Sequence, residues 1–211
     1  MKKLLISVAC LAAMGLFSSS YAASNVEIVK NTKFSEYSST LSWGSAAEKS
    51  VLCRPGTVKW NDTQYEGKDA VEMTCEMALF DMLKESKGFS LVLSIYPREV
   101  WDQLKKELDA KGTIRYVFSV TGAEKIVDLE GVSHRIKWRD GLTLEENFEV
   151  DSETFKTFYV DRDEFRRLMD TVCNINRMQC ALEPTSLFIR ASELLARAKM
   201  QQYFNEKMGL R

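Results

Sequence analysis

The chain has 211 residues, with 29 Lys and Arg against 30 Asp and Glu, a net charge of −1, and 45% hydrophobic residues. This length fits one domain of ordinary size or two small ones, and the apolar and aromatic content excludes a disordered chain. Because the sequence contains no basic block, its charge pattern argues against binding to nucleic acid or to an anionic membrane.

Residues 1–22 have the pattern of an export signal. Lys2 and Lys3 precede an apolar run that is too short to span a membrane comfortably. Ser20 and Ala22 place small residues at positions −3 and −1 of a cleavage site. We therefore expect cleavage near Ala22, a periplasmic or secreted location, and no stable membrane insertion.

Residues 23–50 are rich in Ser, Thr and Asn and predict an irregular N-terminal arm, with at most a short strand near Val26. We expect the remainder, residues 51–211, to form a single domain. Its first element is a predicted hairpin over residues 57–66, with the turn at Asn61-Asp62.

A capping-box pattern at Asp69 then predicts a helix over residues 69–87. Residues 89–96 are apolar on both faces, which indicates a strand in the centre of the sheet. A helix over residues 97–112 and a half-buried strand over residues 114–120 follow. Strand, helix and strand of this length suggest a right-handed crossover connection.

The next segments alternate in hydrophobicity and predict strands over residues 126–129, 132–138 and 142–150. Asp140-Gly141, between the second and third of these, is the strongest hairpin signal in the chain. A further strand is predicted over residues 154–160.

Two helices complete the chain. Asp161 predicts the start of the first, whose apolar stripe consists of Phe165, Leu168, Met169 and Val172. After a loop over residues 173–180, Glu183-Pro184-Thr185 predicts the start of the second, whose apolar stripe consists of Phe188, Ala191, Leu195 and Ala198. The mixed order of elements predicts an α+β fold with a single mixed, largely antiparallel sheet and about four helices, stapled by disulfides.

Four cysteines follow the predicted signal: Cys53, Cys75, Cys173 and Cys180. An even number of cysteines in an exported chain indicates disulfides, and four cysteines allow three connectivities. The spacing favours the local pairs Cys53–Cys75 and Cys173–Cys180. A zinc site or a redox-active pair would require CxxC spacing or histidine ligands, so we expect neither a metal nor a cofactor.

His134 is the single histidine of the chain. Its strand places it in register with Val132, Ile136 and Trp138, which favours a histidine in the core over a catalytic or pH-sensing one. The sequence lacks GxSxG, SxxK, HExxH, Walker A and GxGxxG motifs, and it identifies no pair of catalytic carboxylates.

Candidate residues for binding a partner are few. Trp43 and Trp60 lie outside the predicted apolar stripes and are candidates for the surface. On the last helix, the stripe that contains Phe188 and Leu195 either packs on its own domain or binds a partner.

We therefore predict a soluble exported protein that binds another envelope or secreted protein, or assembles with one, rather than an enzyme. The alternatives are a periplasmic hydrolase of cell-wall glycan or peptide, with acidic residues that the sequence does not identify, and a carrier of a small ligand. A deep pocket with converging carboxylates would favour the hydrolase, whereas an exposed apolar patch would favour the binding protein.

Overall fold

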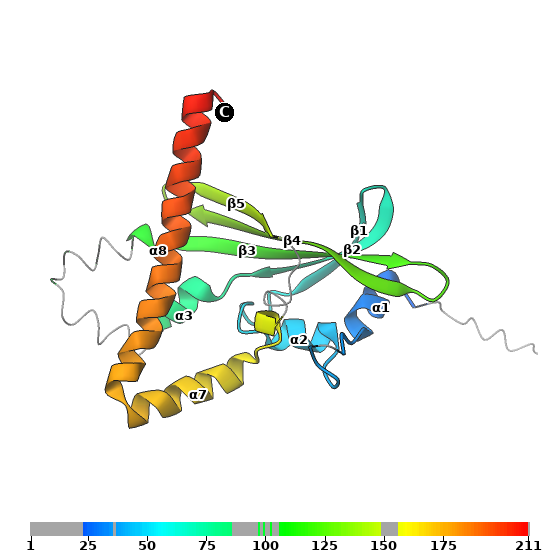
Figure 1. Cartoon of the computed structure of the whole chain (residues 1–211), viewed down its shortest axis with the longest axis horizontal. Helices are drawn as coiled ribbons and strands as arrows, with labels where there is room; N and C mark the ends of the chain where they lie inside the picture. Colours follow the sequence, from blue (N-terminus) through cyan, green and yellow to red (C-terminus); the bar gives the residue numbers. More distant parts are fainter. Residues whose placement is uncertain are drawn as a thin grey trace, which may run out of the picture.

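The structure is a computed structural model that describes residues 23–35, 37–85, 97, 99, 102, 106–148 and 156–210, and only the backbone of residues 177–186. Within these residues the fold is α+β, with helices packed on one face of an antiparallel sheet (Figure 1). None of the helices in this part of the chain is both long and apolar enough to cross a membrane.

The described strands form a five-stranded antiparallel meander in the order β1-β2-β3-β4-β5. Their bounds are β1 Lys59–Tyr65, β2 Lys68–Glu76, β3 Ala110–Thr121, β4 Ile126–Trp138 and β5 Thr143–Phe148. The described helices are α1 Asn25–Asn31, α2 Trp43–Lys49, α3 Leu79–Glu85, α7 Arg162–Ile175 and α8 Arg177–Met208.

The strand register gathers the apolar side chains on one face of the sheet. One row across all five strands consists of Trp60, Met73, Tyr116, Val132 and Phe148, each paired with the next. Because side chains alternate between the two faces of a strand, residues two positions away along each strand share this face. This face is the core and lies beneath the helices.

The opposite face of the sheet carries charged side chains. Glu72 and Arg115 form an ion pair between β2 and β3, and Arg135 Nε lies 2.9 Å from Glu145 Oε1 between β4 and β5. An antiparallel sheet with one covered and one charged face needs helices on a single side.

The predicted irregular arm is wrong, because residues 25–31 and 43–49 are the helices α1 and α2. The serines that suggested an irregular segment are helix caps. Ser24 Oγ accepts a hydrogen bond from the Glu27 amide at 3.2 Å, and Ser42 Oγ accepts one from the Ser45 amide at 3.4 Å. Serine favours this position because its hydroxyl satisfies an amide at the helix start that has no partner within the helix.

Trp43, at the start of α2, is fully buried at the centre of the core. Its ring stacks on Phe158 at 4.1 Å between centroids and meets Tyr116 and Phe118 edge-on at 5.3 and 5.1 Å. The next residue, Gly44, allows α1 and α2 to approach each other, because a Cβ there would lie 3.0 Å from the carbonyl oxygen of Lys30.

The predicted hairpin over residues 57–66 has its turn in the wrong place. β1 runs through Asn61-Asp62, and the chain turns at Glu66-Gly67, where both φ angles are positive, 51° and 77°. A two-residue hairpin turn of this kind needs positive φ at both positions, and glycine adopts such an angle without steric cost.

The predicted helix over residues 69–87 is wrong in its first half, which forms β2, whereas α3 occupies Leu79–Glu85. Val71, Met73 and Cys75 alternate along β2 and are all buried. Packing of this alternating set against the helices outweighs the local capping-box pattern at Asp69.

Further along the chain, residues 114–120 lie within β3 as predicted, and Asp140-Gly141 joins β4 to β5 as predicted. The two strands predicted over residues 126–138 are the single strand β4. Gly112, the predicted end of a helix, instead lies in β3. The predicted strand over residues 89–96 lies outside the described residues, as does most of the helix predicted before Gly112.

In the last third of the chain, the strand predicted over residues 154–160 is wrong where it is described, because residues 156–158 are helical. Asp161 caps α7 as predicted, because its carboxylate accepts hydrogen bonds from the Asp163 and Glu164 amides. The loop predicted over residues 173–180 is wrong. α8 begins at Arg177, directly after the break at Asn176, and Pro184 lies within it.

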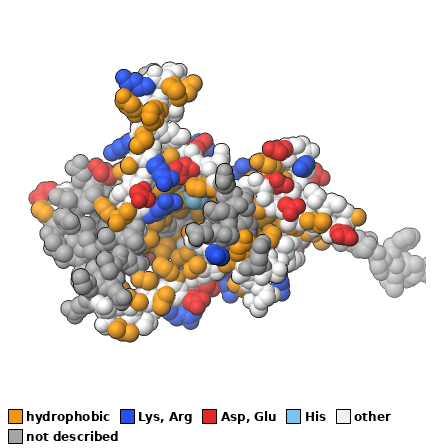
Figure 2. All heavy atoms as spheres, in the orientation of Figure 1, with side chains coloured by type: hydrophobic (Ala, Val, Ile, Leu, Met, Phe, Trp, Pro, Cys, Tyr) orange, Lys and Arg blue, Asp and Glu red, His pale blue; other side chains and the backbone are white. Residues whose placement is uncertain are grey.

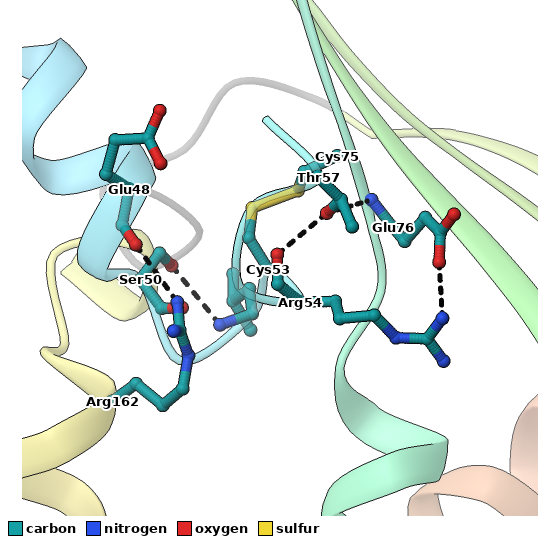
Figure 3. The surroundings of a disulfide bond; sticks show 9 residues. Glu48, Ser50, Cys53, Arg54, Thr57, Cys75, Glu76 and Arg162 are labelled. Carbon is teal, nitrogen blue, oxygen red and sulfur yellow. Dashed lines mark hydrogen bonds and ion pairs between the residues drawn. A yellow bond between two sulfur atoms is a disulfide. The ribbon is translucent and has the colours of Figure 1, made fainter. Parts of the chain in front are cut away.

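The Cys53–Cys75 disulfide is confirmed, with 5.6 Å between the two Cα atoms. Figure 3 shows the polar contacts around it, in which Arg54 pairs with Glu76. Cys173 is also disulfide-bonded. The side chain of Cys180 lies outside the described set, so the Cys173–Cys180 pair stays a prediction.

Arg162 connects this disulfide region to α7. Its Nη2 donates hydrogen bonds to the carbonyl oxygens of Glu48 at 3.0 Å and Ser50 at 3.2 Å (Figure 3). The Val51 amide also donates to the carbonyl oxygen of Val160 at 2.8 Å. The segment after α2 and the start of α7 are therefore held side by side.

We expect Trp43→Ala to lower the free energy of unfolding by about 3–5 kcal/mol, because it empties the centre of the aromatic cluster. Trp60→Ala is the control, since Trp60 is only half-buried and lies at the edge of the sheet. Urea unfolding of the oxidised protein measures both. An equal or smaller loss for Trp43→Ala would contradict the central position assigned to this residue.

Candidate functional site

Helix α8 passes over the end of the sheet near β5 and α3, and its last turns extend past the sheet (Figure 1). The face of α8 turned toward the domain is apolar, and Ala191, Leu194, Leu195 and Ala198 are all buried there. Burial of this face stabilises the docking of α8 by the hydrophobic effect. The docked face of α8 over residues 187–198 is therefore part of this chain's own core.

A polar cluster lies beneath this docked part of α8. Arg197 Nη1 donates a hydrogen bond to Glu146 Oε1 at 3.2 Å, and the Glu146 side chain is only 18% exposed. Glu146 pairs across the strands with His134, whose ring lies 4.4 Å from that of Phe148. The cluster therefore joins α8 to β4 and β5 by charge as well as by apolar contact.

Burial lowers the pKa of His134 to about 4, although the carboxylate of Glu146 opposes this shift and Arg190 adds to it. His134 is therefore neutral near pH 7. Its position in the apolar row of β4 and its low pKa support a histidine of the core.

The opposite face of α8 is also apolar, but it is exposed. We name Ile189, Ala196, Met200, Tyr203 and Phe204 the outer stripe. They recur at intervals of one and two helical turns and lie on the side opposite the docked residues. The four large side chains of this stripe are each 52–58% exposed. Figure 2 shows apolar and basic side chains on the end of α8 that stands clear of the molecule.

The underside of this projecting end is polar. A hollow of about 510 Å³ separates it from the turn between β4 and β5, with Gln201, Gln202 and Asn205 on the helix side and Asp140 and Thr143 on the turn. Polar side chains gain little from burial against one another in place of water. The end of α8 therefore turns its amides toward the domain and its apolar side chains away from it.

A second hollow, of about 420 Å³, lies on the same edge of the molecule, between Trp138 and Leu195. Lys106, Arg139 and Lys199 contribute basic side chains to its lining. Both described hollows thus lie beside α8.

The structure separates the residues predicted to bind a partner. Trp43 is fully buried, so its predicted surface position is wrong. Leu195 is 9% exposed, so of the two alternatives for the stripe that contains it, packing on its own domain is the one found. Trp60 and Phe188 are half-buried and pack against the core. These four side chains belong to the core or pack against it, so they form no common surface with the outer stripe.

The sequence contains a signal for the outer stripe that the predicted apolar stripes do not include. Met200, Tyr203 and Phe204 follow the spacing i, i+3 and i+4, which is typical of one face of a helix. The sequence of α8 thus contains two apolar stripes. Docking on the domain accounts for the first stripe only, so the second needs another explanation.

Comparisons with known proteins provide no relative for this chain. No family model, no curated protein and no solved structure matches it. The functional argument therefore rests on the geometry of α8.

Substitution by Asp should have a large effect on stability on the docked face of α8 and almost none on the outer stripe. Leu195→Asp places a charge in the core and should lower the free energy of unfolding by about 3 kcal/mol or more. Met200→Asp, on the outer stripe, should change it by less than about 0.5 kcal/mol. Urea unfolding at low protein concentration compares the two variants. A similar loss for both would show that the outer stripe is also packed within the monomer.

The pKa of His134 predicts how stability depends on pH. A histidine in the unfolded chain has a pKa of about 6.5, whereas that of folded His134 is about 4. Between these values the unfolded chain binds more protons, so the free energy of unfolding decreases as the pH falls. We expect the titration of His134 to lower the free energy of unfolding by about 2 kcal/mol when the pH falls from about 7.5 to about 5.

The variant His134→Phe, which cannot titrate, should lack that part of the pH dependence. Urea unfolding at both pH values measures the difference between wild type and variant. Equal pH slopes for the two proteins would contradict the low pKa of the buried imidazole.

Proposed function

We propose that this chain is an exported protein that acts by binding another protein through the outer stripe of α8. The export-signal pattern of residues 1–22 and the Cys53–Cys75 disulfide support an oxidising compartment outside the cytoplasm. The exposure of the outer stripe on a projecting helix is the observation that carries the binding function.

The composition of the outer stripe is that of a binding surface. Met and Tyr are enriched in protein interfaces, where they combine a large apolar area with adaptable or polar contacts. Apolar residues at i, i+3, i+4 and i+7 on one helix face are also the pattern by which a helix occupies an apolar groove or pairs with another helix. Scattered exposed apolar residues need no such explanation, but Met200, Tyr203 and Phe204, which adjoin on one helix face, do.

The docked part of α8 holds this surface in place before any partner binds. Leu194 and Ala198 fix the helix on the domain, and the Arg197–Glu146 pair fixes it further along β5. The outer stripe continues from this docked part onto the projecting end without a break in the helix. Less conformational entropy is therefore lost on binding than with a flexible tail.

Site-specific photo-crosslinking tests this function in Gram-negative cells that export the full chain. A photoreactive phenylalanine analogue at Phe204 should give discrete cross-linked protein species. The same analogue at Asn205, which lines the polar hollow beneath the helix, is the matched control and should give none. Two outcomes would contradict the proposal. In the first, the protein is exported but gives no discrete adduct from position 204. In the second, positions 204 and 205 give equal adducts.

A further inference from the structure

We infer that the protein bound by the outer stripe is a second copy of this chain, packed antiparallel through α8 about a two-fold axis at Met200. This inference rests on the proposed function and identifies its partner. It follows from the charges along α8, from the sizes of the side chains on the outer stripe, and from the area that the stripe exposes.

The charges on α8 are arranged for antiparallel pairing. About a two-fold axis at Met200, a residue on one helix lies beside the residue equally far from Met200, in the opposite direction, on the other helix. Glu193 and Lys207 are each seven residues from Met200, and two turns of helix return both to the side of the outer stripe. Glu193 of each copy therefore faces Lys207 of the other. The Glu193 side chain is 52% exposed, and Lys207 is exposed as well.

The same axis matches side chains by size and chemistry. Ala196 faces Phe204 of the second copy, so that a small side chain leaves room for a large ring. Tyr203 faces the aliphatic part of Arg197 of the second copy, because the Arg197 guanidinium pairs with Glu146 of its own domain. Because the axis is two-fold, each of these contacts occurs twice.

A parallel pair would lack this complementarity. It would set Glu193 against Glu193 and Lys207 against Lys207, and like charges in an interface oppose association. The docked faces of the two antiparallel helices point away from each other, so the two domains lie on opposite sides of the helix pair. The projecting end of each α8 then covers the docked part of the other.

The exposed area sets the expected strength of the dimer. A free side chain of this size exposes about 200 Å², so one that is just over half exposed leaves roughly 100 Å² for contact. The large exposed side chains of the outer stripe are Ile189, Met200, Tyr203 and Phe204. Together they offer about 400 Å² per copy, roughly half of the about 800 Å² per partner of a standard interface. We therefore expect a weak, reversible dimer that dissociates on dilution.

Charge exchange tests the pairing with the exported, oxidised protein. Sedimentation velocity over a concentration series should show a monomer–dimer equilibrium. Glu193→Lys and Lys207→Glu should each weaken it at least about tenfold, since each places like charges together twice. The double variant Glu193→Lys with Lys207→Glu restores opposite charges and should return the dissociation constant to within about threefold of wild type.

Arg190→Gln is the matched control, because Glu193→Lys also breaks the Arg190–Glu193 contact of 3.7 Å within the helix. This variant should leave the dimer unchanged. A monomer at every concentration, a double variant that stays as weak as the single ones, or an equal effect of Arg190→Gln would each overturn the inference.

The outcome also separates this inference from the proposed function. A monomeric chain that cross-links from position 204 to a different protein overturns the second copy as partner and keeps the binding function. A chain that gives no cross-link and instead binds vesicles containing phosphatidylglycerol through Phe204 overturns both. A cross-link from position 204 that has the mass of two chains, and that disappears in Glu193→Lys, supports both.

Discussion

The stacking of Trp43 on Phe158 is the contact on which the arrangement of the other elements depends. It joins α2, near the start of the described chain, to the helical residues 156–158, and both rings rest on β3. Large aromatic rings bury more apolar area than other side chains, and stacked and edge-on pairs add further stabilisation. A single ring therefore fixes two segments that are far apart in the sequence.

The position of α8 follows from this contact. Because residues 156–158 are held against the core, Asp161 lies where α7 begins, and Arg162 bonds to the segment that follows α2. α7 then leads directly through Asn176 into α8, which returns over β5. The outer stripe is thus presented by a helix whose direction is determined in the core, well away from the exposed surface itself.

The sequence predicts the elements whose local and tertiary signals agree. β3 has apolar residues at every second position from Ile114 to Val120, Asp140-Gly141 is a strong hairpin signal, and the Asp161 cap coincides with the start of an apolar stripe, so all three are found as predicted. Cys53 and Cys75 are paired as their spacing suggests.

Where the two kinds of signal disagree, packing decides and the sequence prediction fails. Asp69 resembles a helix start, but the buried alternation of β2 makes it part of a strand. Trp43 is taken for a surface residue because its polar neighbours hide that it belongs to the core. The outer stripe could not be predicted for another reason. A buried helix can also be apolar on two faces, so the sequence pattern alone does not reveal that one face of α8 is exposed.

The disulfide also has a consequence for the edge of the described sheet, where β1 lies. Cys53 and Cys75 are separated by 22 residues and enclose the β1–β2 hairpin, whose turn at Glu66-Gly67 is exposed. Exposed turn tips are preferred sites of proteolytic cleavage. A cut at this turn would leave β1 covalently attached to β2 as long as the bond stays oxidised. The disulfide therefore keeps the edge strand in place after nicking and prevents the unpaired edge of β2 from recruiting another chain.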